Sequence, residues 1–141
     1  MSEEENQAVV RRYFAEVWSQ GKLAVVDELT APDFVRHSTT TPGGVRGHAA
    51  LKAYVTRNRA AFQDFQVTVD DVFAAGEKVA VRWTGRGIHR GEYGGIAPTD
   101  TRVSVTGINI LRLAGGKLAE EWMNFDALGL QQQLRASPAP S

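Results

Sequence analysis

The sequence predicts an α+β fold in which a strongly curved, mostly antiparallel sheet wraps around N-terminal helices. Apolar residues recur at helical spacing in much of residues 3–62, and from residue 65 to 125 they alternate with a period of two. Helices followed by long strands are typical of an antiparallel α+β domain. The strands expected over residues 78–93 and 101–113 exceed the usual length, and Gly85, Gly87 and Gly107 lie where a sheet can bend. A sheet curved in this way forms a cone with an internal pocket.

The elements follow in order along the chain. Helices are expected over residues 3–20, 23–29 and 48–62, with Ser2 as the first N-cap and Gly21 as the stop. The run 34–37 is extended, and the Thr- and Gly-rich run 38–47 is expected to be a loop or lid. Strands rich in Val, Ile, Trp and Thr are expected over residues 65–74, 78–93, 101–113 and 117–125. A helical segment over residues 127–134 closes the domain.

Length and composition indicate one globular domain over residues 1–135, with a flexible tail at 136–141. The chain has 141 residues, 43% of them hydrophobic, and its tail consists of Ala, Ser and Pro. The 16 basic residues balance 16 acidic ones, which argues against nucleic acid or an anionic membrane as a partner. No apolar stretch approaches the roughly 20 residues of a membrane span, and the acidic start is unlike a secretory signal. We therefore expect a cytoplasmic protein, and the lack of cysteine excludes thiolate chemistry.

Three segments carry a family resemblance. They read FVRH at 34–37, GIHRGEYGGIAPT at 87–99 and GKLAEEWMNFD at 116–126, and the last leads into LGLQQQL at 128–134. This pattern resembles the SnoaL-like polyketide cyclases, or ester cyclases, of the nuclear transport factor 2-like superfamily. The resemblance extends from the first helix to residue 134 and implies the cone-shaped fold, also described as cystatin-like.

The resemblance also implies an activity: a cofactor-free intramolecular aldol condensation of an apolar, oxygenated, polyketide-like substrate. In that reaction an Asp on the last strand exchanges a proton with carbon, and Asp126 is the residue that matches it in the motif E-x-W-x-x-x-D. Surrounded by Trp83, Trp122 and Phe125, this carboxylate would be desolvated, which raises a pKa toward the working pH. The alternative is that Asp126 only caps the last helix.

Strand alternation predicts which side chains line the pocket. On the last strand, Glu120, Trp122, Asn124 and Asp126 share one face, and the opposite face is apolar except for Glu121. We expect the mixed face to line the pocket and the apolar face to pack. With side chains from other elements, the predicted substrate-binding residues are Trp122, Asn109, Asn124, Trp83, Tyr13, Tyr93 and Glu120. The two amides could donate to an enolate oxygen, whereas Glu120 could instead pair with Arg112 across the sheet.

His37 and His89 complete the predicted catalytic set with Asp126. An imidazole could hydrogen-bond a substrate carbonyl or hold the protonation state of Asp126, and the alternative for each is a structural role. These three residues would also form a two-histidine, one-carboxylate metal set. No short ligand spacing supports such a set, so we expect no metal and no cofactor.

Other functions could use the same cavity. It could serve an isomerase, an epoxide or ester hydrolase, or a ligand-binding module without catalysis. Epoxide opening would require Glu120 and Asp126 to hold a water between them. The convex face of the sheet is expected to carry Ile88, Ile108 and Ile110 beside charges, and such an apolar patch predicts a homodimer.

Overall fold

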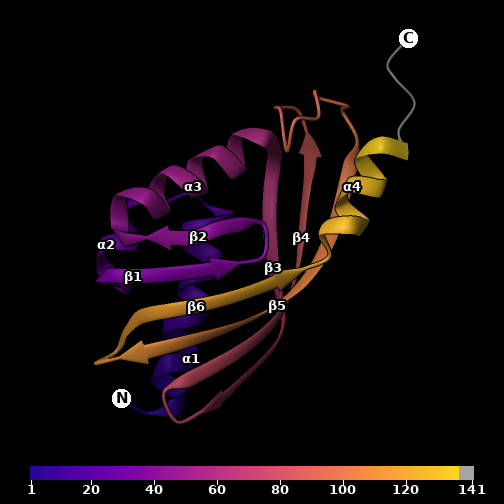
Figure 1. The fold of residues 1–141 in the computed structure, drawn as a ribbon. Helices are drawn as coiled ribbons and strands as arrows, with labels where there is room; N and C mark the ends of the chain where they lie inside the picture. Colours follow the sequence, from indigo (N-terminus) through magenta and orange to yellow (C-terminus); the bar gives the residue numbers. More distant parts are fainter. Residues whose placement is uncertain (137–141) are drawn as a thin grey trace.

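A curved six-stranded sheet forms the body of the molecule (Figure 1). The computed structural model describes residues 1–136. The strands are β1 (Thr30–Ser38), β2 (Thr41–Arg46), β3 (Phe62–Ala75), β4 (Lys78–His89), β5 (Arg102–Ala114) and β6 (Lys117–Phe125). Their order across the sheet is β2-β1-β6-β5-β4-β3, in which β1 runs parallel to β6 and every other pair is antiparallel. The predicted α+β class with a mostly antiparallel sheet is confirmed.

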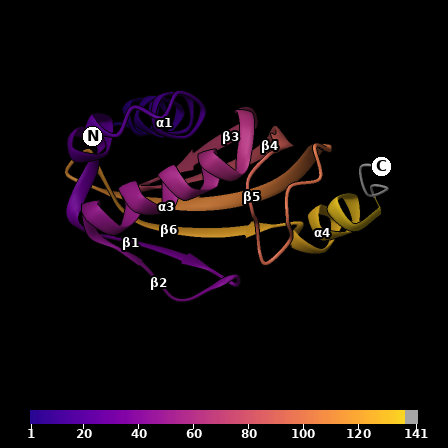
Figure 2. The same ribbon diagram turned by 90° about the horizontal axis from the view of Figure 1, so that it is seen from above.

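Helices cover the concave face of this sheet. The first helix, α1 (Glu3–Arg12), continues as the π-helix η1 (Tyr13–Ser19), and α2 (Ala24–Leu29), α3 (Gly47–Ala61) and α4 (Ala127–Ala136) follow. Figure 2 shows α1 and α3 on the same side of the sheet, with α4 beyond the end of β6. The main core lies between these layers, where side chains such as Val17 and Val55 pack with Val81 and Leu111. Within residues 1–136, no helix is both long and apolar enough to cross a membrane.

The N-terminal helix follows directly from its sequence. Ser2 Oγ accepts a hydrogen bond from the Glu5 amide at 3.0 Å, and Glu5 Oε1 accepts one from the Ser2 amide at 3.1 Å. This reciprocal capping box confirms Ser2 as the N-cap. The wider π-helical turn that follows places four side chains on one buried face, namely Tyr13, Phe14, Val17 and Trp18.

Several segments differ from the sequence prediction. Residues 41–46 form the edge strand β2, because the backbone pairs with β1 and Val45 is buried there, so the expected loop is wrong. Strand β4 ends at His89, since the amides of Arg90 and Gly91 donate to the Ala61 carbonyl. The tail expected at 136–141 lies outside the described residues except for Ala136, which is the last residue of α4.

The predicted facing of β6 is reversed. Leu118 pairs with Leu113 and Glu120 pairs with Arg112, so Ala119 is an extra residue that bulges from the ladder. After this bulge, Glu121 and Met123 point into the concave side and are buried. Glu120, Trp122 and Asn124 consequently point to the outer face, because neighbouring strand residues alternate sides.

Candidate functional site

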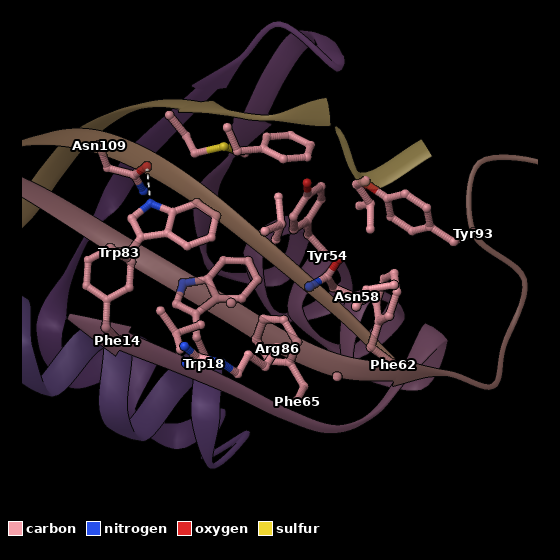
Figure 3. A pocket seen from close by; sticks show the side chains of 18 of the residues that line it. Phe14, Trp18, Tyr54, Asn58, Phe62, Phe65, Trp83, Arg86, Tyr93 and Asn109 are labelled. Carbon is pink, nitrogen blue, oxygen red and sulfur yellow. Dashed lines mark hydrogen bonds between the residues drawn. The ribbon is translucent and has the colours of Figure 1, made fainter. Parts of the chain in front are cut away.

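A cavity lies between the concave face of the sheet and the helices η1 and α3 (Figure 3). Its volume is about 80 Å³, several times the space that one water requires. Aromatic side chains dominate the wall, including Phe14, Trp18, Phe62, Phe65, Trp83 and Phe125. Asn109 and Trp83 lie at one end, and Tyr93 lies at the other.

A second, outer hollow of about 450 Å³ adjoins the cavity. The two spaces share Tyr54 and Asn58 of α3 and Tyr93 of the loop after β4. Arg57 and Glu92 add charges to the outer hollow only. Burial raises the pKa of Tyr93, so its phenol stays protonated near neutral pH and can donate a hydrogen bond where the two spaces meet.

Glycines on β4 and β5 make the space that the aromatic side chains occupy. Gly107 pairs with Trp83 across the sheet, and a Cβ at position 107 would overlap the Trp83 ring. A Cβ at Gly87 would press against Phe62 in the same way. These glycines were expected to mark bends, and their close contacts show that they also set the shape of the cavity wall.

A buried network of hydrogen bonds supports the Asn109 end of the cavity. Glu121 is fully buried, and its Oε1 accepts from the Tyr13 hydroxyl at 2.9 Å and from Arg36 Nε at 3.0 Å. Its Oε2 accepts from Asn109 Nδ2 at 2.8 Å. Asn109 Oδ1 in turn accepts from Trp83 Nε1 at 2.8 Å. The Glu121 carboxylate thus has three donors, which is what a buried charge requires.

The network fixes the protonation of its members. Burial and the neighbouring Glu121 charge raise the pKa of Tyr13 well above its ordinary value, so the phenol remains a donor. Burial is the strongest influence on Arg36 and opposes its charge, but Glu121, Tyr13 and Tyr54 together outweigh burial and hold the pKa of Arg36 above its ordinary value. Arg36 Nε lies 3.0 Å from Glu121 Oε1, so the two side chains form a buried ion pair.

Arg36 is also a wall residue of the cavity. Its guanidinium carbon lies 4.8 Å from the ring centroid of Trp18 and 4.9 Å from that of Tyr54. Arg36 Nη1 is buried and has no hydrogen-bond partner among the described residues, and the same holds for Trp18 Nε1. Two residues that line the cavity thus each have a buried donor atom without an acceptor among the described residues.

Asp126 lies outside this apolar wall. Its side chain is exposed, and Oδ1 accepts from the Gly129 amide at 2.9 Å at the start of α4. The desolvation expected for Asp126 is wrong, because the side chain is exposed and Trp122, one of the aromatic residues expected around it, faces the other side of the sheet. The capping geometry is present, and the catalytic role of Asp126 stays a prediction.

Neither predicted histidine lines the cavity. His37 follows the inward-pointing Arg36 and therefore faces outward, where its Nε2 lies 2.7 Å from Glu120 Oε2 and its ring stacks on Trp122. His89 is fully buried, and its Nδ1 accepts from the Thr99 amide at 3.2 Å. Both contacts correspond to the structural alternative.

The remaining predicted residues divide between the two faces. Asn109, Trp83 and Tyr93 line the cavity as expected, and the Tyr13 hydroxyl reaches Glu121 behind the wall. Trp122, Asn124 and Glu120 lie on the outer face, so their predicted place in the pocket is wrong.

Arg112 Nη2 lies 3.3 Å from Glu120 Oε1, which is the cross-sheet pairing that was the alternative prediction for Glu120. The hydrogen bond with His37, more than the Arg112 pairing, lowers the pKa of Glu120. With Glu120 outside, the pair of carboxylates that epoxide opening requires is not assembled in the cavity. Within residues 1–136, no three His, Asp or Glu side chains gather closely enough to ligate one metal ion.

Sequence reasoning missed Arg36, Tyr54, Asn58 and Glu121. The signal for the ion pair was present, because Glu121 is the only charge on an otherwise apolar strand face. A lone charge on a core face predicts a buried partner of opposite sign. Arg36, which lies between Val35 and His37, is that partner.

An apolar cavity with few polar groups, enclosed between a sheet and helices, is the arrangement typical of small-molecule sites. The chain belongs to the SnoaL-like polyketide cyclase family, whose model matches residues 8–134. A comparison with curated proteins finds no match.

Solved structures support this placement. A candidate polyketide cyclase from Acidithiobacillus ferrooxidans is 28% identical, covers 98% of this chain and 100% of its own, and has a TM-score of 0.87. AclR, a candidate hydroxylase from Streptomyces galilaeus, is 28% identical over 99% of this chain and 87% of its own, with a TM-score of 0.83. A protein with a ketosteroid isomerase-like fold from Catenulispora acidiphila is 19% identical over 94% of this chain and 93% of its own, with a TM-score of 0.74, and this likeness concerns the fold alone.

Proposed function

We propose that this protein is an enzyme that binds an apolar, oxygenated, polyketide-like substrate in the cavity and closes a ring by cofactor-free intramolecular aldol condensation. One observation carries the proposal: an aromatic cavity is lined by Arg36 and Trp18, and each of these residues has a buried donor, Arg36 Nη1 and Trp18 Nε1, without an acceptor among the described residues. Membership of the SnoaL-like polyketide cyclase family supports the same reaction class.

The donors suit the charge that develops in an aldol reaction. A base removes a proton from the carbon beside a carbonyl, and the electron pair moves onto that carbonyl oxygen to give an enolate. The enolate carbon then bonds to a second carbonyl carbon of the same molecule, and the resulting alkoxide takes up a proton. Preorganised donors in a water-poor site stabilise such an oxyanion strongly. Arg36 and Trp18 would perform this role.

Asp126 is the proposed acid–base group. Phe125 and Leu130 line the cavity on either side of Asp126 in the chain, which is consistent with a position at the rim. A substrate that extends from the cavity past Phe125 would bring its acidic carbon to this carboxylate. We expect this extension because the inner cavity of about 80 Å³ is small for a multi-ring substrate.

The direct test is Asp126→Asn. Asn is as good a helix cap as Asp, so the fold is retained, whereas turnover falls at least about 100-fold because acid–base catalysis is lost. Glu120→Gln, on the outer face, is the matched control and keeps its turnover. Product analysis against a panel of diketones and epoxides measures the reaction, and unchanged turnover in well-folded Asp126→Asn would remove Asp126 from the mechanism.

A second candidate is a ligand-binding module without catalysis. It is favoured by the cavity wall, which among the described residues includes no Asp, Glu or His. This alternative predicts a compound that co-purifies and is detected by native mass spectrometry, with no conversion that depends on Asp126.

We further propose that the protein is a cytoplasmic homodimer that pairs through the outer face of the sheet. Phe73, Ala80, Ile110 and Trp122 lie in register across four strands. Phe73 is 65% exposed and Ile110 is 43% exposed, which forms an apolar stripe. Ile88, by contrast, is only 6% exposed and adds nothing to it, contrary to expectation.

Light scattering tests this assembly. The wild-type chain is expected to have the mass of a dimer at micromolar concentration, and Ile110→Glu is expected to give a folded monomer. A monomeric wild-type chain would contradict the proposal.

A further inference from the structure

We propose that the ligand of the cavity carries an anionic oxygen, either a carboxylate or an ionised enol or phenol, and that Arg36 binds it. The inference rests on the proposed function to the extent that the cavity must bind a small molecule. It adds that the molecule is an acid with an apolar ring body, and it assigns a specificity-determining residue that the sequence patterns did not reveal.

The Arg36 side chain is fixed in position by its neighbours, but one of its donors has no partner among the described residues. Its Nε donates to Glu121 Oε1 at 3.0 Å, and the rings of Trp18 and Tyr54 flank the guanidinium. The side chain is only 6% exposed, and Nη1 has no partner among the described residues. Buried charged donors are almost always hydrogen-bonded, so an acceptor from outside the chain is expected at Nη1.

The neighbouring Trp18 also has a buried hydrogen-bond donor without a partner among the described residues. Trp18 Nε1 is buried and unpartnered within the described chain, and it belongs to the ring on which Arg36 stacks at 4.8 Å. Both residues line the cavity. A carboxylate offers two acceptor oxygens, which matches two donors on adjoining groups better than a single carbonyl oxygen does.

The charges of the cavity wall are also compatible with an anionic ligand. The described residues that line the cavity include Arg36 and Arg86, of which Arg86 is exposed, and no carboxylate. Glu121 lies behind the wall, and its oxygens already accept from Tyr13, Arg36 and Asn109. The wall therefore contains no acidic group that would repel an anionic oxygen at Arg36.

The rest of the cavity wall indicates which kind of molecule would fill it. Apart from these donors, the wall is aromatic and aliphatic, with Phe14, Phe65, Trp83, Met123 and Phe125 among its members. Such a surface binds a ring system by excluding water, whereas an inorganic anion would leave it unfilled. The occupant is therefore an organic acid, with its anionic oxygen at Arg36 and its ring against the aromatic wall.

Fluorescence titration of the wild-type chain provides the test, because Trp18 and Trp83 both line the cavity. Naphthoate is compared with naphthamide, a neutral molecule of nearly the same shape, and nitrophenolate is compared with nitrobenzene. We expect the anionic member of at least one pair to bind about tenfold tighter or more, as a charge-assisted hydrogen bond predicts. The pair that shows this preference distinguishes a carboxylate from an ionised enol or phenol.

Two variants assign the preference to a residue. Arg36→Gln alone would leave Glu121 buried without its ion-pair partner, so it is combined with Glu121→Gln to keep the charges balanced. This double variant is expected to bind the acid and the amide equally well. Arg86→Gln removes the other arginine of the wall and is expected to keep the preference.

The outcomes separate the two proposals. Equal affinity for acid and amide in the wild-type chain overturns the inference about Arg36 and leaves the binding cavity intact. A preference that survives in the double variant, or that disappears in Arg86→Gln, overturns the assignment to Arg36. Failure of every probe to bind, neutral or charged, overturns both the inference and the proposed function.

Discussion

An ion pair and a histidine–carboxylate hydrogen bond lie one residue apart on the same two strands, and their surroundings differ sharply. Arg36 and Glu121 face the concave side, where their side chains are 6% and 0% exposed. His37 and Glu120 face the outer side, where the exposed fractions are 38% and 26%. Because strand residues alternate between faces, adjacent positions of similar chemistry are placed in opposite environments.

The difference in burial explains why we assign ligand binding to the inner pair. The outer pair is partly exposed to solvent, which weakens the electrostatic interaction between its side chains. The inner pair is buried, so its polar atoms need partners other than bulk water, and Glu121 has such partners in Tyr13, Arg36 and Asn109. Arg36 Nη1 has no partner among the described residues, and this difference between Glu121 and Arg36 is the feature from which we infer binding.

The largest predicted effect is the loss of stability when the carboxylate of the inner pair, Glu121, is removed. Glu121→Ala leaves Arg36 buried and uncompensated, so the free energy of unfolding is expected to fall by about 3–5 kcal/mol. Glu120→Ala is its matched control and is expected to cost at most about 1 kcal/mol, because the outer pair is solvated. Urea unfolding measures both, and equal losses would contradict the contrast between the two faces.

A smaller effect is predicted for Tyr13→Phe, which removes one donor from Glu121. A hydrogen bond to a charged group contributes about 1.5–3 kcal/mol, so the variant is expected to lose this much stability at neutral pH. The pKa of Tyr13 is raised in the folded state, so this contribution is complete below the unfolded pKa of about 10 and is lost as the pH rises through the folded value.

Stability curves of the wild type and Tyr13→Phe at increasing alkaline pH measure this behaviour. The gap between them is expected to narrow above about pH 10, where the unfolded wild-type phenol ionises. A gap that stays constant or widens would show that Tyr13 does not donate to a buried carboxylate.

The smallest predicted effect concerns the outer pair at acidic pH. The His37 hydrogen bond lowers the pKa of Glu120, so its stabilising contribution is present above the unfolded value of 4.5 and is lost as the pH falls through the folded value. In His37→Ala the Glu120 pKa is expected to rise toward 4.5. NMR titration of the Glu120 carboxyl carbon measures this shift, and an unchanged pKa would assign the lowering to Arg112 instead.

Long periodic segments made the fold predictable. The helix starting after Ser2 and the strands after Phe65 repeat their patterns over many residues, so local errors do not change the class. Strand β2 was missed because pairing with β1 prevails over the weak strand propensity of its Pro and Gly residues.

The site was predictable only where alternation was uninterrupted. On β4 and β5 it placed Trp83 and Asn109 in the cavity correctly. On β6 the bulge at Ala119 places Leu118 and Glu121 on the same side of the sheet. Strict alternation would place them on opposite sides, so the sequence pattern gave the wrong facing. Arg36 was missed because charged residues are expected at the surface, and its burial depends on a partner far away in the chain.

Methyl NMR of the two methionines tests most directly whether ligands enter the cavity between sheet and helices. Met123 lines the cavity, whereas Met1 is 67% exposed at the N-terminus and serves as the internal reference. Titration with naphthoate is expected to shift the Met123 methyl resonance through the ring current of the bound aromatic and to leave that of Met1 in place. Saturable binding of naphthoate with an unmoved Met123 resonance would show that ligands bind elsewhere and would contradict the account.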